Sequence, residues 1–281
     1  MKKAFKIIPI IFTIISITLL SSTKIASETP IIKSRNNNVC KIVSGDILVY
    51  VIFTKTKDSY DWKEYDLAST IDSLNVAINW IQQKAENNNI KAKLMLDYFG
   101  NDSIKSIYSK MGGSVKKLIT NKDGIESIEK WGDKIAKISS QEKDKERLIA
   151  QLRDQNGVES VALIYMINNY FSSDYAISFN TTNQEQVEYS IISSKKPQII
   201  AQEILHLFGA PYLGNHSSIK NEKVQEEMNK LYPKDIMLSK YQSNINKCEI
   251  SDITKYYIGW ADSLSTENKT LLKQAKVKSK L

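Results

Sequence analysis

Apolar residues in the first third of the chain follow three distinct patterns. Residues 46–54 form a continuous apolar run rich in β-branched side chains, which is typical of a strand buried on both faces. Residues 66–86 carry apolar positions at steps of three and four, as expected of an amphipathic helix. Residues 90–98 alternate between apolar and polar positions, which predicts a second strand. This strand–helix–strand order predicts a βαβ unit with parallel strands.

The remaining sequence continues these patterns. Residues 102–154 have a helical periodicity, and three apolar strands are predicted after them, at 159–167, 174–179 and 186–192. Turn-forming residues separate the last two strands closely, so we expect antiparallel pairing there. The patterns together predict an α+β fold with a mixed five-stranded sheet.

The N-terminal segment has the order of a secretory signal peptide. Lys2, Lys3 and Lys6 precede an apolar stretch at 7–20, and small polar residues follow it, which predicts a signal peptide over 1–27. The apolar stretch is shorter than the roughly 20 residues that span a bilayer, although an uncleaved anchor is the alternative. We therefore expect a secreted or periplasmic protein with no stable membrane span after signal cleavage.

The net charge of +8 belongs to the two ends of the chain. Residues 1–27 contribute four positive charges and residues 269–281 contribute five, so the body between them carries one net negative charge. A nucleic-acid-binding domain needs a basic face, and this body does not supply one. We therefore expect no nucleic-acid partner, and we assign residues 263–281 to a basic tail.

The chain contains two cysteines, Cys40 and Cys248. In an exported protein two cysteines permit one disulfide, which would join the start of the mature chain to its C-terminal region. The sequence leaves open whether the two residues approach each other.

A later helix places polar side chains among apolar ones. Pro197 opens it, and Gly209 can end it in a left-handed conformation. Gln202, Glu203 and His206 lie between, in a segment otherwise rich in isoleucine and leucine. Because an unpaired buried carboxylate costs several kcal/mol, Glu203 is expected to line a cleft or to meet a partner.

This helix resembles the active-site helix of the metzincins, a family of zinc metallopeptidases. The family motif H-E-x-x-H-x-x-G-x-x-(H/D) matches at Glu203, His206 and Gly209, and the sequence departs from it at Gln202 and Tyr212. Downstream, Asp235-Ile236-Met237 looks like the Met-turn that lies beneath the metal in that family.

The resemblance implies a fold, a cofactor and roles for these residues. It implies a metzincin-like, twisted five-stranded sheet with a backing helix, an active-site helix and a smaller, mostly helical C-terminal lobe. It implies Zn²⁺ as cofactor, Glu203 as general base, His206 as a metal ligand and Met237 as the floor of the site. The strand at 174–179 would pair with an extended peptide or protein substrate.

The same resemblance suggests how the chain is divided. We expect a polar leader at 28–45, a zincin-like subdomain at 46–209 with a helical insertion near 102–154, and a C-terminal subdomain with the Met-turn at 210–262.

The two departures leave three functions open. Gln202 offers an amide oxygen, which is a weaker zinc ligand than imidazole, and Tyr212 binds a metal only as phenolate. His216 and Asp235 are further possible donors. The chain is then an active peptidase with a shifted ligand set, a pseudopeptidase that binds peptides or a partner protein, or a structural protein that kept the fold alone. As an alternative to a metal site, Glu203 and His206 would form a hydrogen-bonded pair in an ordinary buried helix. Tyr212 and Met237 would then only pack in the core.

Overall fold

A computed structural model describes most of the chain. The described residues are 30–35, 37–100, 103–169, 174–180, 187–213, 222–238 and 244–275. The predicted signal peptide, the last residues of the basic tail and His216 lie outside these ranges.

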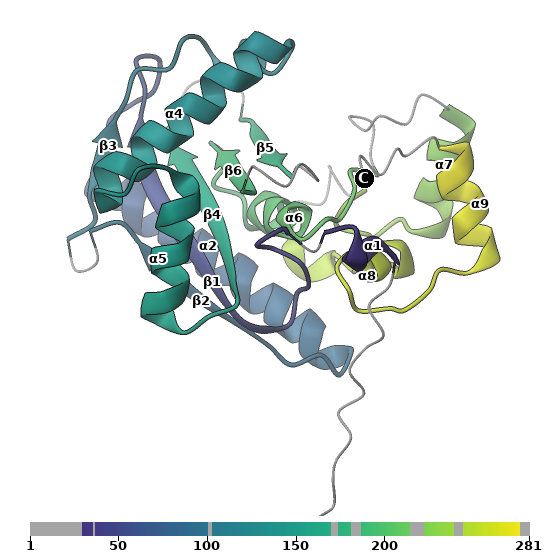
Figure 1. The fold of residues 1–281 in the computed structure, drawn as a ribbon. Coiled ribbons are helices and arrows are strands. Elements are labelled where there is room, and N and C mark those ends of the chain that lie inside the picture. Colours follow the sequence, from purple (N-terminus) through teal and green to yellow (C-terminus); the bar gives the residue numbers. More distant parts are fainter. Residues whose placement is uncertain are drawn as a thin grey trace, which may run out of the picture.

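Six described strands form a single mixed sheet (Figure 1). Its main path runs in the order β2 (Ala92–Tyr98), β1 (Gly45–Lys55), β4 (Ser160–Ile167), β6 (Tyr189–Ile192) and β5 (Ala176–Phe179). β1 and β2 are parallel and β5 is antiparallel to β6, which confirms both pairings predicted from the sequence. The short β3 (Ser106–Tyr108) pairs with the last residues of β1 and so extends the edge that β2 occupies.

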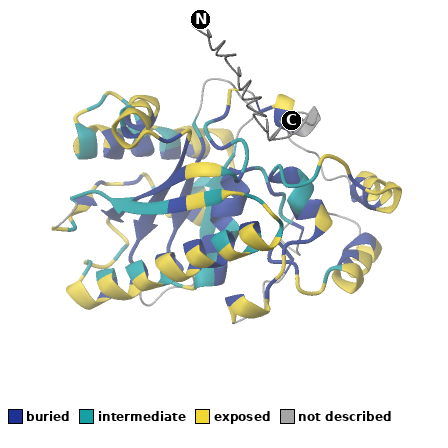
Figure 2. Ribbon diagram, turned by 90° about the horizontal axis from the view of Figure 1, so that it is seen from below, coloured by how far each residue is buried: buried dark blue, intermediate teal, exposed yellow. Residues whose placement is uncertain are grey.

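Helices cover both faces of the sheet, which is why its central strands are apolar throughout. Side chains of β1 alternate between the two cores: Val49 belongs to one and Tyr50 to the other. The helices α2 (Glu64–Asn87) and α6 (Pro197–Leu207) pack on the first face, whereas α4 (Lys122–Ser140) and α5 (Lys145–Asn156) pack on the second. The outward sides of α2, α4 and α5 are exposed, as the yellow outer surfaces of helices in Figure 2 show, whereas α6 has no exposed residue.

The C-terminal part of the chain is largely helical, as the sequence predicts for a smaller lobe. It contains α7 (Glu222–Leu231), the 3₁₀ turn η1 (Ile245–Lys247), α8 (Asp252–Tyr257) and α9 (Thr266–Gln274). α7 and α9 lie to one side of the sheet (Figure 1). The segment assigned to a basic tail thus includes a helix with buried Leu271 and Leu272.

The predicted helical stretch at 102–154 differs from the structure near its start. It opens with β3 and the short helix α3 (Val115–Leu118) before α4 and α5. Each long helix begins at a side-chain cap: Asn121 accepts the Gly124 N–H at 2.8 Å, and Asp144 accepts the Arg147 N–H at 3.0 Å. β3 was not predicted because its three residues are too few to establish an alternating pattern.

The segment expected to be a polar leader packs into the domain. It contains the short helix α1 (Pro30–Lys33), and Ile32, Arg35 and Val43 are buried. Trp260 donates its indole N–H to the Val43 carbonyl at 2.7 Å, which fastens this segment to the C-terminal part of the chain.

The disulfide that the sequence permits is not formed. Cys40 and Cys248 are two buried thiols. The Cys40 thiol donates to the Val161 carbonyl at the start of β4, at 3.3 Å, and the Cys248 sulfur lies 3.9 Å from the Asn244 carbonyl oxygen. Each thiol is therefore directed toward a carbonyl of its own surroundings rather than toward the other sulfur.

Across the described residues, we find no helix that combines the length and the apolar character needed to cross a bilayer.

Candidate active site

Helix α6 is a buried helix whose C-terminal end is fixed by a glycine and by the side chain of Asn180. Pro197 occupies its first turn, and Gly209 follows it with φ +93°. The Asn180 amide donates to the carbonyl of His206 at 2.6 Å, which satisfies an acceptor in the last turn. The position of α6, and with it that of its polar side chains, is therefore fixed at the C-terminal end of the helix.

Glu203 is buried and is fully engaged by two hydroxyl donors. Tyr212 donates to its Oε1 and Ser178 of β5 donates to its Oε2, both at 2.6 Å. Burial raises the pKa of Glu203 to about 7, and the hydrogen bonds from Ser178 and Tyr212 oppose part of that rise. The expectation that Glu203 meets a partner is confirmed, and its two partners are protein side chains.

His206 is buried one turn after Gln202. Its Nδ1–H donates to the Ala210 carbonyl at 2.5 Å, which places the lone pair on Nε2. Nε2 is buried with no hydrogen-bond partner among the described residues. Burial lowers the pKa of His206 to about 3, so the ring is neutral at physiological pH.

Tyr212 closes the site from the segment that follows α6. Its ring lies against the imidazole of His206, with 3.4 Å between the ring centroids and 42° between the planes. Burial and the neighbouring Glu203 carboxylate raise the pKa of the Tyr212 hydroxyl far above its usual value. Tyr212 is therefore a neutral phenol that donates a hydrogen bond, whereas a metal would require the phenolate.

The Met-turn candidate is held by a buried carboxylate. Asp235 accepts the Met237 N–H and the Ser251 N–H, both at 2.6 Å, and the Thr254 hydroxyl at 2.9 Å. These donors belong to the turn and to the start of α8, so Asp235 holds the two segments together. This accounts for its burial without a role as metal donor.

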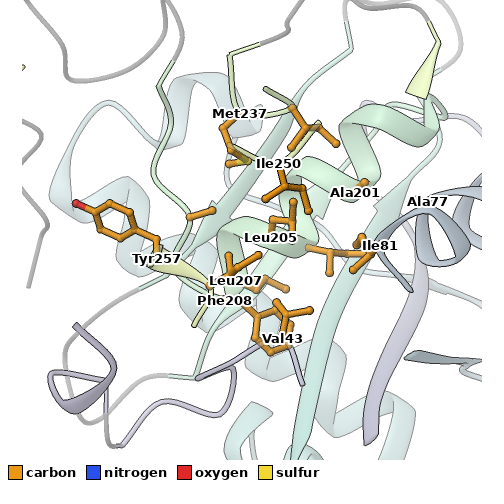
Figure 3. Close-up of a cluster of buried hydrophobic side chains, with 14 of the residues drawn as sticks. Val43, Ala77, Ile81, Ala201, Leu205, Leu207, Phe208, Met237, Ile250 and Tyr257 are labelled. Atoms are coloured by element: carbon orange, nitrogen blue, oxygen red, sulfur yellow. The ribbon is translucent and has the colours of Figure 1, made fainter. Parts of the chain in front are cut away.

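Met237 lies in the same apolar cluster as the inner face of α6. It is almost fully buried, and Figure 3 shows it in one group with Ile250 and with Leu205 and Ala201 of α6. Met237 therefore belongs to the core beside α6, and its role as the floor of a metal site stays a prediction.

One buried side chain that holds the end of α6 was missed by the sequence reasoning. Arg35 is buried and donates to the carbonyl oxygens of Phe208 and Lys41, and to that of Tyr257 at 3.0 Å. Phe208 and Tyr257 stand at the C-terminal ends of α6 and α8, where a cation is favourable. A Cβ on Gly209 would collide with this guanidinium, which explains the glycine in addition to its positive φ.

The described residues do not fit a catalytic zinc ion. His206 alone has the character of a ligand, with Nδ1 bonded to a carbonyl and a lone pair on Nε2. Gln202 is half-buried and uncharged, Tyr212 is a protonated donor, and Glu203 is bonded to two hydroxyls. Over the part of the chain that the structure describes, no three His, Cys, Asp or Glu side chains form a group that could hold a metal ion.

The comparisons find similarity to solved structures but not to known sequences. No protein-family model and no curated protein sequence matches this chain. The crystal structure of metalloproteinase-II from Bacteroides fragilis is similar to it, with 18% sequence identity and a TM-score of 0.38. The match covers 81% of this chain and 60% of that one, so this chain spans less than two thirds of that structure.

Proposed function

We propose that this protein is a non-catalytic relative of the metzincin peptidases that binds an extended peptide segment of a partner protein. The observation that carries the proposal is the 2.6 Å hydrogen bond from the Tyr212 hydroxyl to Glu203. A general base must reach a water or a substrate proton, and this carboxylate instead accepts from Tyr212 and Ser178. Glu203, His206 and Gly209 of the motif are thus kept, whereas the described residues around them do not supply a set of zinc ligands.

The edge strand β5 supports the peptide-binding part of the proposal. β5 is the last strand on its side of the described sheet, and all four of its residues are only half-buried. Natural edge strands are commonly blunted by lysine or proline, and Ala176–Phe179 contains neither. An extended peptide can add to such an edge through backbone hydrogen bonds.

Ser178 connects this edge to the closed centre. It lies on β5, shares a 2.7 Å hydrogen bond with Ser190 of β6, and donates to Glu203 of α6. This chain of hydroxyl groups holds the edge strand at a fixed position relative to α6. We infer that Glu203 serves to position β5 through this network and does not act as a catalytic base.

Metal content and proteolysis test the non-catalytic part. The mature protein is expected to hold no zinc after dialysis and to leave casein intact, whereas Gln202→His combined with Tyr212→Asp is expected to gain zinc. Adding Glu203→Gln to that double variant is the matched control, because it removes the base and retains the ligands. About one tightly held zinc per wild-type chain, together with casein cleavage, would overturn the proposal.

Hydrogen exchange tests the peptide-binding part. A mixture of peptides from digested casein is expected to slow amide exchange in Ala176–Phe179 and to leave exchange in β2, at the opposite edge, unchanged. Unchanged exchange in β5 at saturating peptide would remove the binding function and favour a purely structural protein.

A further inference from the structure

The sheet has a topological switch point between β1 and β4. From β1 the chain passes through α2 to β2 on one side, whereas α4 and α5 lead into β4 on the other side. The two connections also cover opposite faces of the sheet (Figure 1). In open sheets with parallel strands, a crevice forms outside the carboxyl ends of the strands at such a point.

A cavity of about 170 Å³ lies at this position. Its wall includes residues directly after β1 (Lys57 and Ser59) and the last residue of β4 (Ile167). The lining shares no residue with the Tyr212–Glu203 site.

Hydrogen bonds of the backbone hold the walls of this cavity in place, two of them to carbonyl groups and one to a side-chain hydroxyl. The Tyr60 N–H donates to the Asn168 carbonyl at 2.9 Å, which fastens the loop after β1 to the end of β4. Ser59 accepts the Thr56 N–H at 2.8 Å and so closes the loop on itself. The Ser109 N–H donates to the Lys55 carbonyl at 2.9 Å and fixes the wall on the side of β3. The crevice is therefore preformed.

The lining divides into an apolar floor and a basic mouth. Met111, Val115 and Ile167 are buried and belong to the core beneath α4 and α5. Lys57 and Lys116 are exposed, and they outnumber the one acidic residue of the described lining, Asp58. A ligand that matches both parts has an apolar body and a negative charge at one end.

We propose that this cavity binds a small organic carboxylate, with its charged group beside Lys57 and Lys116 and its apolar body against Met111, Val115 and Ile167. The volume suits a single small ring or a short aliphatic chain better than a peptide. The ammonium groups supply charge-assisted hydrogen bonds to the carboxylate.

The test uses benzoate, acetate and inorganic phosphate as probes, with calorimetric titration of the mature wild-type protein. Benzoate is expected to bind in the millimolar range or tighter and about tenfold more tightly than acetate, since acetate lacks the apolar body. Lys57→Gln with Lys116→Gln is expected to weaken benzoate binding about tenfold. Lys117→Gln is the matched control, because Lys117 is exposed on the same helix and does not line the cavity.

Three outcomes would overturn the assignment. No heat from benzoate would remove the site altogether. Undiminished binding in the double lysine variant would place the ligand elsewhere. Phosphate that binds as tightly as benzoate would show that the apolar floor contributes nothing and that the site takes an inorganic anion. Thermal unfolding of every variant verifies that the fold is retained.

Discussion

Tyr212 donates its hydroxyl to the carboxylate of Glu203 at 2.6 Å while its ring lies against His206. One side chain thus contacts both polar residues that the motif retains. The contact is possible because the chain reverses at Gly209, whose φ of +93° suits glycine, and brings the segment after α6 back over the helix. A tyrosine at this place lets the carboxylate remain buried without a metal.

Removal of the Tyr212 hydroxyl tests how much that contact stabilises the fold. Tyr212→Phe retains the ring and removes one of the two hydroxyl donors to Glu203, so we expect a loss of about 1.5–3 kcal/mol in unfolding free energy near pH 8. Urea denaturation measures it. Tyr232→Phe is the matched control, because the Tyr232 hydroxyl donates to the neutral Asn268 amide oxygen at 2.7 Å and its loss is expected to be smaller. Equal losses in the two variants would show that the Glu203 contact has no special strength.

The pH dependence of stability follows from the raised pKa of Glu203. Its pKa of about 7 in the folded state exceeds the ordinary value of 4.5, so the folded state binds more protons than the unfolded state between these values. The contribution of Glu203 to the free energy of unfolding is therefore fully present below pH 4.5, where the carboxyl is protonated, and is lost as the pH rises toward 7. Glu203→Gln removes the titration and is expected to gain about 3 kcal/mol relative to wild type across that window.

Urea unfolding of both proteins from pH 4.5 to 8 measures this difference. The buried Glu188 also has a pKa raised to about 7, but it is present in both proteins and cancels in the comparison. A difference that does not change with pH would contradict the raised pKa of Glu203.

Much of the fold could be predicted because it depends on local periodicity. The apolar run of β1 and the spacing of apolar residues in α2 depend on neighbours within one or two turns, and both elements were placed within two residues of their bounds. β3 was missed because three residues are too few to establish a period. The site was only partly predictable, since the motif located Glu203 and His206 without their partners.

Arg35 shows why the rest of the site could not be predicted. Its acceptors Phe208 and Tyr257 lie 173 and 222 positions away, and a lone arginine in an Asn-rich segment resembles a solvated residue. Burial lowers its pKa to about 10, and the buried Glu188 opposes part of that fall. Neither effect has a signature in the local sequence.

Replacement of Arg35 should loosen two helix ends together. Arg35→Gln removes the buried cation from the carbonyls after α6 and α8, and we expect a loss of about 3 kcal/mol or more in unfolding free energy. Lys33→Gln changes an exposed cation of the same segment and is expected to be nearly neutral. Faster hydrogen exchange at both helix ends would identify the cause, and a loss confined to residues 30–43 would contradict it.

The cysteines predict a distinct chemical behaviour. Both thiols are buried, so the native protein is expected to react slowly with a thiol reagent. The unfolded protein is expected to react with two equivalents of the reagent per chain in the absence of a reductant. Titration of the mature protein in denaturant measures this. A reaction with the reagent that occurs only after reduction would show that Cys40 and Cys248 form the disulfide that the structure lacks.

The second face of the sheet contains a buried cation whose loss should loosen α4 and α5. Lys145 of α5 contacts Glu129 at 2.9 Å and Asp133 at 2.7 Å, and Glu129 also accepts the Tyr189 hydroxyl at 2.9 Å. The side chains of Lys145 and Glu129 are only 5% and 12% exposed, so Lys145→Gln leaves a carboxylate without its cation and is expected to cost about 3–5 kcal/mol. Lys143→Gln, at an exposed position before α5, is the control. Hydrogen exchange should then speed up in α4 and α5 before it does in α2, because Lys145 joins α4 to α5 and, through Glu129, to Tyr189 of β6. Equal acceleration on both faces would instead show that the domain unfolds as one unit.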